Sequence, residues 1–138
     1  MEAISWVVHK YIMHGFLWSI HKTHHEPENH IFEKNDIFSL FFGGVAILLI
    51  YLGSELKDYR FWIGIGITLY GSTYFILHDL LIHKRIKVFK KFNNNYLRAI
   101  SKAHRDHHKA KDRKSSSSFG LLLVPKKHFK NKISGGDL

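Results

Sequence analysis

Ten of the twelve histidines in this 138-residue sequence fall into four clusters whose spacing repeats. A pair spaced H-x4-H is followed by a triplet spaced H-x2-H-H, and further along the chain the same pair and triplet occur again in the same order. Imidazole nitrogen is a common ligand of iron, zinc, copper and nickel, so the pattern predicts a metal site. The predicted ligands are His9, His14, His21, His24, His25, His78, His83, His104, His107 and His108.

Helical periodicity gives a reason for the spacing of the triplets. Residues at i, i+3 and i+4 project from one face of a helix, so His21, His24 and His25 can point toward one place, as can the triplet at 104–108. Residues at i and i+5 lie about 140° apart on a regular α-helix. Each pair is therefore expected to flank the site, unless a helix end or a π-bulge brings its two rings together.

The number and type of ligands narrow the choice of metal. Ten nitrogens are too many for one ion and suit two ions with positions left open, whereas a structural zinc site closes with four ligands. The chain has no cysteine, which excludes iron–sulfur clusters, zinc ribbons, disulfide frameworks and thiol catalysis. It also lacks the H-E-x-x-H motif and the Glu-x-x-His pairs of carboxylate-bridged di-iron bundles. We expect two non-haem iron ions that use O2 as co-substrate, with zinc entering a purified sample by mismetallation.

Four further residues lie near the pattern or outside it. Asp79 and Asp106 stand beside predicted ligands, where a carboxylate can orient an imidazole from a second shell; the alternative is an ordinary helix-surface carboxylate. His30 and His128 have no partner at ligand spacing, so we expect them to be surface residues.

Two charge-free apolar segments separate the two halves of the histidine pattern. Residues 37–54 and 61–77 contain 18 and 17 residues without a charge, and as helices each would cover about 26 Å of a hydrocarbon layer that is roughly 30 Å thick. A pair of buried core helices is the alternative, but the rest of the chain has too little apolar sequence to cover them. Two spans form a hairpin, which returns the chain to the side it left and brings all four clusters to one membrane face.

Charge predicts which face that is. The net charge is +10, and 19 of the 21 Lys and Arg residues flank the hairpin while only Lys57 and Arg60 lie in its loop. By the positive-inside rule the metal site and both termini are cytoplasmic. The excess cations, Arg85 among them, are then expected to sit against anionic lipid headgroups rather than nucleic acid.

These observations predict an all-α protein: an integral membrane helical hairpin whose cytoplasmic, His-rich helical cap holds a dinuclear metal site. We expect one domain over residues 1–130 and a disordered tail over 131–138. The first eight residues, MEAISWVV, resemble the last turns of a helix and are too short to span a membrane. A further span before residue 1 is therefore one alternative.

Several segments together resemble a known family of enzymes. They are HKYIMHGFLWSIHKTHH, the FEKND at 32–36, YFILHDLLIHKR, YLRAISKAHRDHH and the SFGLLLVP at 118–125. In this order they are similar to the bacterial beta-carotene hydroxylases, which belong to the fatty acid hydroxylase superfamily of membrane di-iron enzymes. The resemblance covers about residues 3–125, and the family's ligand histidines correspond one by one to the ten named above. Family members usually carry another hydrophobic segment before the first histidine pair.

The resemblance implies an O2-dependent monooxygenase of the bacterial inner membrane. It would hydroxylate carbon 3 of beta-ionone rings, converting beta-carotene through beta-cryptoxanthin to zeaxanthin with electrons from a ferredoxin-type donor. The chemistry is consistent, because an unactivated ring methylene has neither an acidic proton nor a leaving group, and oxygen chemistry at a redox metal can attack it. A long apolar substrate would enter from the bilayer, and we expect residues 16–18 and 120–124 to line its access.

Alternative functions stay open on the sequence alone. A related hydroxylase or desaturase could act on a fatty acyl, sterol or other carotenoid substrate. A non-enzymatic membrane protein could also use the histidine clusters to bind metal. A transporter is disfavoured because residues 37–77 place no ionisable ligand inside the two spans.

Overall fold

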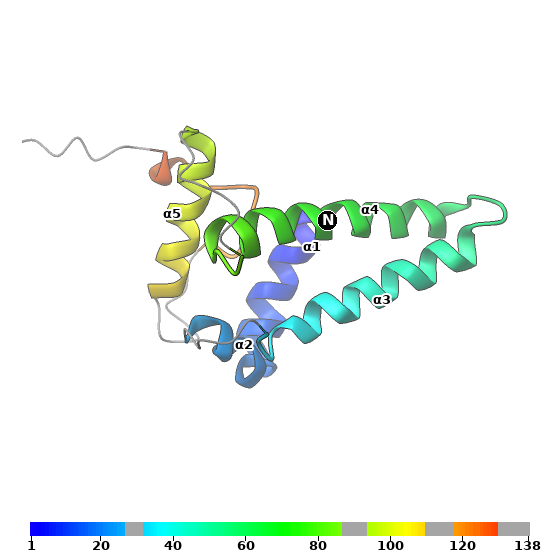
Figure 1. Cartoon of the computed structure of the whole chain (residues 1–138), viewed down its shortest axis with the longest axis horizontal. Coiled ribbons are helices and arrows are strands. Elements are labelled where there is room, and N and C mark those ends of the chain that lie inside the picture. The colour runs from blue at the N-terminus through cyan, green and yellow to red at the C-terminus, as the bar shows by residue number, and fades with distance from the viewer. Residues whose placement is uncertain (27–31, 87–93, 110–117, 130–138) are drawn as a thin grey trace, which may run out of the picture.

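The structure, a computed structural model, describes residues 1–26, 32–86, 94–109 and 118–129, and every regular element in these ranges is a helix (Figure 1). This confirms the predicted all-α class for the described residues. In chain order the elements are α1 (Glu2–Val7), the π-helix η1 (Val8–Phe16), α2 (Trp18–His25), α3 (Asp36–Gly53), α4 (Tyr59–Tyr74), the π-helix η2 (Phe75–Ile82), α5 (Asn95–Lys109) and the 3-10 turn η3 (Lys126–His128).

Helices α3 and α4 form the predicted hairpin and extend to one side of the molecule (Figure 1). Asp58 caps α4, since its Oδ1 accepts a hydrogen bond from the backbone N–H of Arg60 at 2.9 Å. The second helix is longer than the charge-free segment predicts, because α4 continues without a break into η2 and ends at Ile82. The end of this helix therefore places His78 and Asp79 far from the hairpin loop, among the helices at the opposite end of the hairpin.

Two glycines allow the helices of the hairpin to approach closely. A Cβ atom on Gly64 would lie 2.7 Å from Ile50 Cγ1 and 2.8 Å from the carbonyl oxygen of Ala46, and one on Gly53 would overlap the backbone of Phe61. Small residues at such crossings permit backbone-to-backbone packing between apolar helices. The choice of glycine at these two positions is thus explained by close contact between α3 and α4.

The outer surface of the hairpin is apolar. Leu40, Phe41 and Ile47 on α3 and Trp62 and Leu69 on α4 are all largely exposed. Among the described residues, Asp36–Gly53 and Tyr59–Ile82 are long and apolar enough to cross a membrane, and only 11% and 17% of their most apolar windows are buried. Core helices of a water-soluble protein bury such surfaces, so this exposure favours the interpretation of residues 37–54 and 61–77 as spans.

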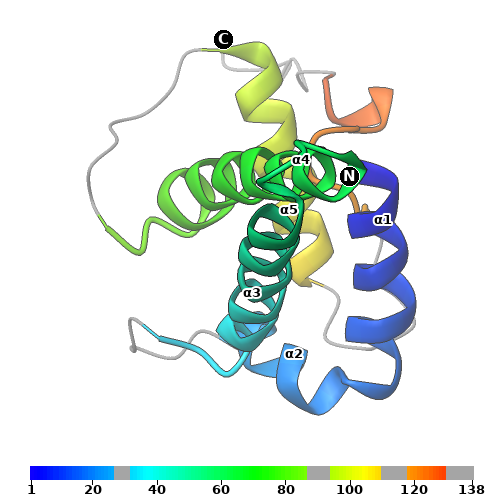
Figure 2. The same cartoon turned by 90° about the vertical axis from the view of Figure 1, so that its right-hand side faces the viewer.

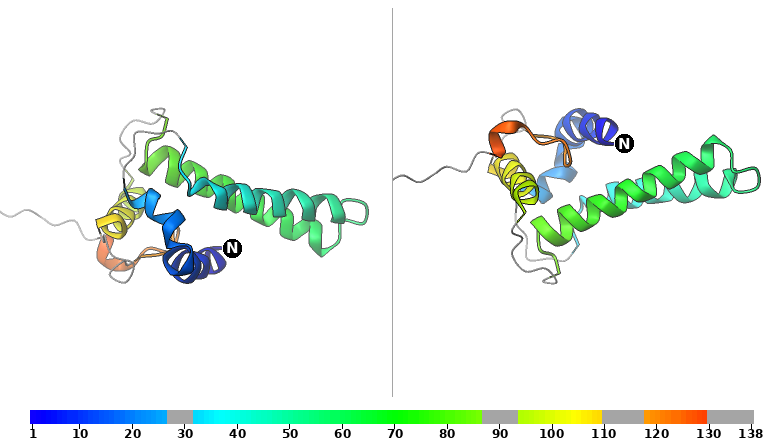
Figure 3. Two further views of the ribbon diagram at one scale, coloured as in Figure 1. Left: turned by 90° about the horizontal axis from the view of Figure 1, so that it is seen from below. Right: turned by 90° about the horizontal axis from the view of Figure 1, so that it is seen from above.

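The remaining helices form a cap at the end of the hairpin opposite its loop, as Figures 1 and 3 show from three directions. In Figure 2, helix α1 lies beside the hairpin and α5 crosses behind its end. The chain kinks at Gly15 (φ −91°, ψ −123°), near the end of η1 and before α2. The cap has a small apolar core around Ala99, Ile100, Ala103 and Leu121. Most of its buried side chains are imidazoles. The predicted tail at 131–138 lies outside the described residues.

Candidate metal centre

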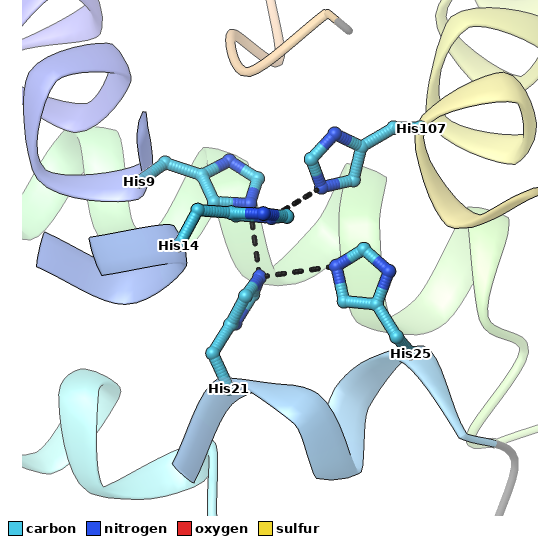
Figure 4. Close-up of side chains that lie close together, drawn as sticks. All are labelled: His9, His14, His21, His25 and His107. Atoms are coloured by element: carbon cyan, nitrogen blue, oxygen red, sulfur yellow. Dashed lines mark hydrogen bonds between the residues drawn. The ribbon is translucent and has the colours of Figure 1, made fainter. Parts of the chain in front are cut away.

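Nine of the ten predicted ligands meet in two groups, and in each group one nitrogen per ring lies within 4.8 Å of the others. Figure 4 shows the rings of the first group converging from η1, α2 and α5. The tenth residue, His78, adjoins the second group, since its Nε2 lies 3.1 Å from Nε2 of His24. The first group consists of His9, His14, His21, His25 and His107, and the second group consists of His24, His83, His104 and His108.

The triplets do not each converge on one point as predicted; each is shared between the groups. His21 and His25 belong to the first group while His24 belongs to the second, and on α5 His107 is separated from His104 and His108. The reason is angular, because residues i+3 and i+4 differ by about 100° around a helix and can face neighbouring positions. Each half of the sequence therefore contributes to both groups.

The H-x4-H pairs lie in or directly after π-helical segments. A π-helical segment is one of the two arrangements, with a helix end, expected to bring the two rings of a pair together. A π-helix has i→i+5 hydrogen bonds, and the backbone N–H of His83 donates such a bond to the carbonyl of His78 at 2.9 Å. The backbone N–H of Leu17 does the same toward Ile12 at 3.0 Å. Residues five apart then share a face, and the ring centroids of His9 and His14 are 5.1 Å apart while those of His78 and His83 are 4.6 Å apart.

Hydrogen bonds at Nδ1 fix the tautomer of three imidazoles. The partner of each is an oxygen that accepts only, so Nδ1 carries the hydrogen and Nε2 of the neutral ring carries a lone pair. Metal-ligating histidines use their second nitrogen in this way. The contacts are His9 Nδ1 to the Phe119 carbonyl oxygen at 2.8 Å, His21 Nδ1 to Asn35 Oδ1 at 2.7 Å and His24 Nδ1 to Glu33 Oε2 at 2.8 Å.

Burial keeps these three rings neutral at pH 7. Desolvation, reinforced by neighbouring imidazoles, lowers the pKa of His9 and of His24 well below the ordinary value. Desolvation is also the main reason that the pKa of His21 falls to about 4. The Nε2 atoms inside the cluster are therefore lone-pair donors, as metal binding requires.

The separations between Nε2 atoms suit a shared metal ion. An ion about 2.0–2.1 Å from two nitrogens holds them about 3.0 Å apart at a right angle and about 3.4 Å apart at a tetrahedral angle. In the His9–His21 pair both Nδ1 atoms carry the hydrogen, so two neutral Nε2 lone pairs face each other, and a cation between them would turn their repulsion into coordination. The observed separations are 3.1 Å for His9–His21, 3.2 Å for His14–His107, 3.3 Å for His21–His25, 3.1 Å for His24–His78 and 2.8 Å for His83–His104.

A network of ions borders the second group. Arg85 Nη2 lies 3.2 Å from Glu33 Oε2, its Nε lies 3.0 Å from Asp79 Oδ1, and its Nη1 donates to Asp36 at 2.9 Å and 3.0 Å. Asp79 Oδ1 in turn lies 3.5 Å from His78 Nδ1, within ion-pair distance but without a hydrogen bond between them. The prediction that Arg85 meets lipid headgroups is wrong, because its guanidinium is enclosed by these three carboxylates.

Asp106 takes the second of its two predicted roles, an ordinary helix-surface carboxylate, whereas His128 differs from its predicted position. Asp106 accepts a hydrogen bond from Lys109 Nζ at 2.9 Å, and its Oδ2 lies 3.5 Å from His128 Nδ1, so its partners are not the clustered imidazoles. His128 is only 5% exposed, and its prediction as a surface residue is therefore wrong. It is absent from both groups. The packing of η3 on α5 buries it, and His30 lies outside the described residues.

An apolar cavity of about 430 Å³ leads to the first group. It lies between α1–η1 and the hairpin, reaches His9 and Asp79, and includes Ile47, whose exposed side chain marks an opening beside α3. Its walls do not include the predicted access residues 16–18 and 120–124. Residues 120–124 are absent because Glu2 holds them on the far side of α1. Its carboxylate accepts hydrogen bonds from the backbone N–H groups of Leu122 and Leu123 at 2.8 Å and 3.1 Å.

Sequence reasoning assigned no role to Glu33, Asn35 or the Phe119 carbonyl, although each orients an imidazole. A signal for the first two was present, because Glu33 and Asn35 belong to a polar segment directly before an apolar span. Polar groups at that position lie at the end of the hairpin opposite its loop, where the clusters lie. The carbonyl of Phe119 carries no such signal, since any residue type supplies one.

Comparisons with known proteins show which proteins the chain is similar to. The profile of the Fatty acid hydroxylase family matches residues 1–125. A beta-carotene hydroxylase of Pantoea ananas is 44% identical over 125 residues, which cover 91% of this chain and 71% of the relative, and one of Pseudescherichia vulneris is 42% identical over 126 residues, covering 91% and 72%. The chloroplastic beta-carotene 3-hydroxylase 2 of Arabidopsis thaliana is 38% identical over 130 residues, covering 91% and 42%.

No solved structure matches the chain significantly. The family profile covers most of the sequence, including all ten clustered histidines. The Pantoea and Pseudescherichia relatives are 44% and 42% identical over 91% of the chain. These matches include the residues that form both groups and the hairpin that carries them. The chain belongs to the fatty acid hydroxylase family.

Proposed function

We propose that the protein is a membrane monooxygenase that hydroxylates carbon 3 of the beta-ionone rings of beta-carotene, giving beta-cryptoxanthin and then zeaxanthin. The observation that carries the proposal is the apolar cavity, which runs beside the hairpin and reaches His9 of the first group. The names of the relatives supply the substrate class, since curated bacterial and plant members are beta-carotene hydroxylases.

We assign five nitrogen ligands to each of two ions. The first group supplies five, and the second group supplies four together with His78, whose Nε2 is 3.1 Å from that of His24. Imidazole suits iron among other ions, and two bound iron ions would supply the O2 chemistry that inserts an oxygen atom into a C–H bond. Glu33 and Asn35 hold imidazoles of the site in orientation through hydrogen bonds to Nδ1.

The chain itself selects and positions the substrate. Apolar residues from α1, η1, α3, α4 and η2, including Val8, Phe38, Phe42 and Phe75, line the cavity and would exclude water around an apolar ring. The polyene of such a substrate continues past Ile47 along the apolar face of the hairpin. The ring is thereby held at one end of a path that runs within the hydrocarbon layer.

The membrane topology is part of the same proposal. We propose that α3 and the α4–η2 helix cross the membrane, with the cap and the described ends of the chain on the cytoplasmic side. The supporting observations are the apolar exposed surface of the hairpin and the 19 Lys and Arg residues outside its loop. The metal centre then lies just beneath the bilayer, where an apolar substrate reaches it without entering water.

Expression in bacterial cells that accumulate beta-carotene tests the function. Zeaxanthin and beta-cryptoxanthin should appear in the pigment extract, and the His107→Ala variant should produce neither. Unchanged beta-carotene from a folded, iron-loaded protein with a competent electron donor would refute the proposed substrate. Hydroxylated or desaturated acyl chains in the same cells would instead indicate the related lipid activity.

A further inference from the structure

Helix α5 presents two chemically different faces. Its buried face carries His104 and His107 together with Ala99, Ile100 and Ala103. Its other face carries four cations spaced i, i+4, i+7 and i+11, and at about 100° per residue these form a single stripe centred opposite the buried face. The stripe consists of Arg98, Lys102, Arg105 and Lys109.

The stripe continues onto η3. Lys126 and Lys127 are exposed there, and η3 is fixed against α5 by the contact between His128 Nδ1 and Asp106 Oδ2 at 3.5 Å. Asp106 is the single acidic residue of α5, and it is already paired with Lys109. We call the surface formed by Arg98, Lys102, Arg105, Lys109, Lys126 and Lys127 the cationic face.

The cationic face is directed away from the hairpin. The histidines of α5 contact rings on α2 and η2, for example His104 Nε2 to His83 Nε2 at 2.8 Å, so the metal centre lies between α5 and the end of the hairpin. The opposite side of α5 therefore faces outward at the end of the molecule farthest from the hairpin loop (Figure 1). If the hairpin spans the bilayer, this side faces the aqueous phase rather than lipid headgroups.

The proposed reaction requires an external source of electrons. Insertion of one oxygen atom of O2 into a C–H bond and reduction of the other to water consumes two electrons and two protons. The chain has no cysteine with which to hold an iron–sulfur cluster of its own. A carrier protein must therefore dock close enough to pass electrons to the metal centre.

We propose that the cationic face is the docking surface for a soluble, acidic one-electron carrier protein, which delivers the two electrons in successive encounters. The inference rests on the proposed function. Charge complementarity favours this partner, because a field of one sign steers an oppositely charged protein and raises its rate of association. A carrier bound there is separated from His104 and His107 by the width of one helix, about 10 Å.

A comparison of two electron donors tests this. The probe is an acidic [2Fe–2S] ferredoxin kept reduced by its reductase, and the reference is dithionite, which needs no docking surface. In the triple variant Lys102→Gln, Arg105→Gln, Lys109→Gln, the ratio of the ferredoxin-driven to the dithionite-driven rate of hydroxylation should fall at least tenfold, through a higher KM for ferredoxin. Lys57→Gln in the hairpin loop removes a cation at the opposite end and should leave the ratio unchanged.

The possible results separate the two proposals. A ratio that stays unchanged in the triple variant overturns the docking surface while leaving the proposed function intact. A loss that is equal for both donors and depends on the anionic lipid content of the reconstituted membrane also overturns it, and assigns the face to lipid. Failure of the unaltered protein to hydroxylate beta-carotene with either donor contradicts the proposed function itself.

Discussion

The Nε2 atoms of His9 and His21 lie 3.1 Å apart, although each ring already donates a hydrogen bond from Nδ1. Two lone pairs therefore face each other in a buried position, which costs free energy unless a cation lies between them. Similar close approaches occur in both groups, so we expect the metal-free protein to be strained by repulsion that bound metal relieves.

The first prediction concerns metal removal. A ligand that binds only the folded state, at a free concentration one hundred times its Kd, raises the free energy of unfolding by about 2.7 kcal/mol. Two tightly bound ions should raise it by more than this. Chelation should thus lower the Tm of the detergent-solubilised protein by several degrees, and Fe²⁺ should restore it. Equal Tm values with and without metal, measured by thermal unfolding on a sample whose iron content is known, would argue against the assigned centre.

Second, one histidine from each group can be compared with His128. His24→Ala and His107→Ala remove an Nε2 ligand, so the iron content should fall below two per chain and hydroxylation should drop at least a hundredfold. His128→Ala should retain iron, yet it should cost about 1–2 kcal/mol of stability because this side chain is buried against α5. Metal analysis and denaturation of the three variants check this. Full activity in either ligand variant would refute the assignment.

Third, Glu33 should tune metal affinity through His24. Loss of such an orienting partner typically weakens metal binding 10- to 100-fold, and Glu33→Ala should do so while Glu33→Gln, which retains an acceptor oxygen, should do less harm. The matched control is Glu26→Gln, because Glu26 pairs with Lys22 on the surface and does not contact an imidazole. Iron titration gives the affinities. An identical affinity in Glu33→Ala and the unaltered protein would show that the contact is unimportant.

Fourth, adjacent glycines on α3 offer a matched pair for the cavity. A Cβ atom on either Gly43 or Gly44 would meet no atom within 4 Å, but only Gly43 lines the cavity. Gly43→Leu should therefore fill the space and lower zeaxanthin formation at least tenfold with no loss of iron, whereas Gly44→Leu should be close to neutral. Pigment analysis at equal protein level decides between them. Equal losses in both variants would place the substrate elsewhere.

Fifth, acid should destabilise the metal-free protein. Desolvation and neighbouring imidazoles lower the pKa of His25 and of His83 to about 3 and that of His108 to about 2, whereas the unfolded chain has values near 6.5. Between these limits the unfolded state binds more protons, so stability falls as the pH drops below about 6.5, by up to about 1.4 kcal/mol per pH unit for each such histidine. The Tm of chelated protein should decline steadily from pH 7 to pH 5. A constant or rising Tm would contradict the buried neutral rings.

Some elements of this structure could be predicted because the residues that determine them lie close together in the sequence. The apolar segments at 37–54 and 61–77 predict the helices of the hairpin, and the i, i+5 spacing of His9 and His14 requires the irregular helix that η1 provides. Other features depend on contacts between distant segments. The angle of about 100° between residues i+3 and i+4 allows each triplet to divide between two groups, but which group each ring joins depends on how α2 and α5 face each other.

Contacts between distant segments also explain why the predictions for Arg85 and His128 were wrong. Arg85 lies in a basic segment and its charge alone suggests lipid contact. The turn after η2 instead brings it beside Asp79 on η2, Asp36 at the start of α3 and Glu33 just before α3. His128 is buried only because η3 folds back onto α5. Charge and spacing describe a residue's preferences, whereas its neighbours are set by tertiary packing.

Isotope labelling tests the central claim most directly. Purified protein loaded with iron and supplied with beta-carotene, an electron donor and ¹⁸O₂ in ordinary water should give beta-cryptoxanthin with one ¹⁸O and zeaxanthin with two, as measured by mass spectrometry. That result is required of a metal centre that inserts one atom of O2 into each ring. Hydroxyl oxygen that came from water, or the absence of hydroxylated product from a fully iron-loaded sample, would contradict the account.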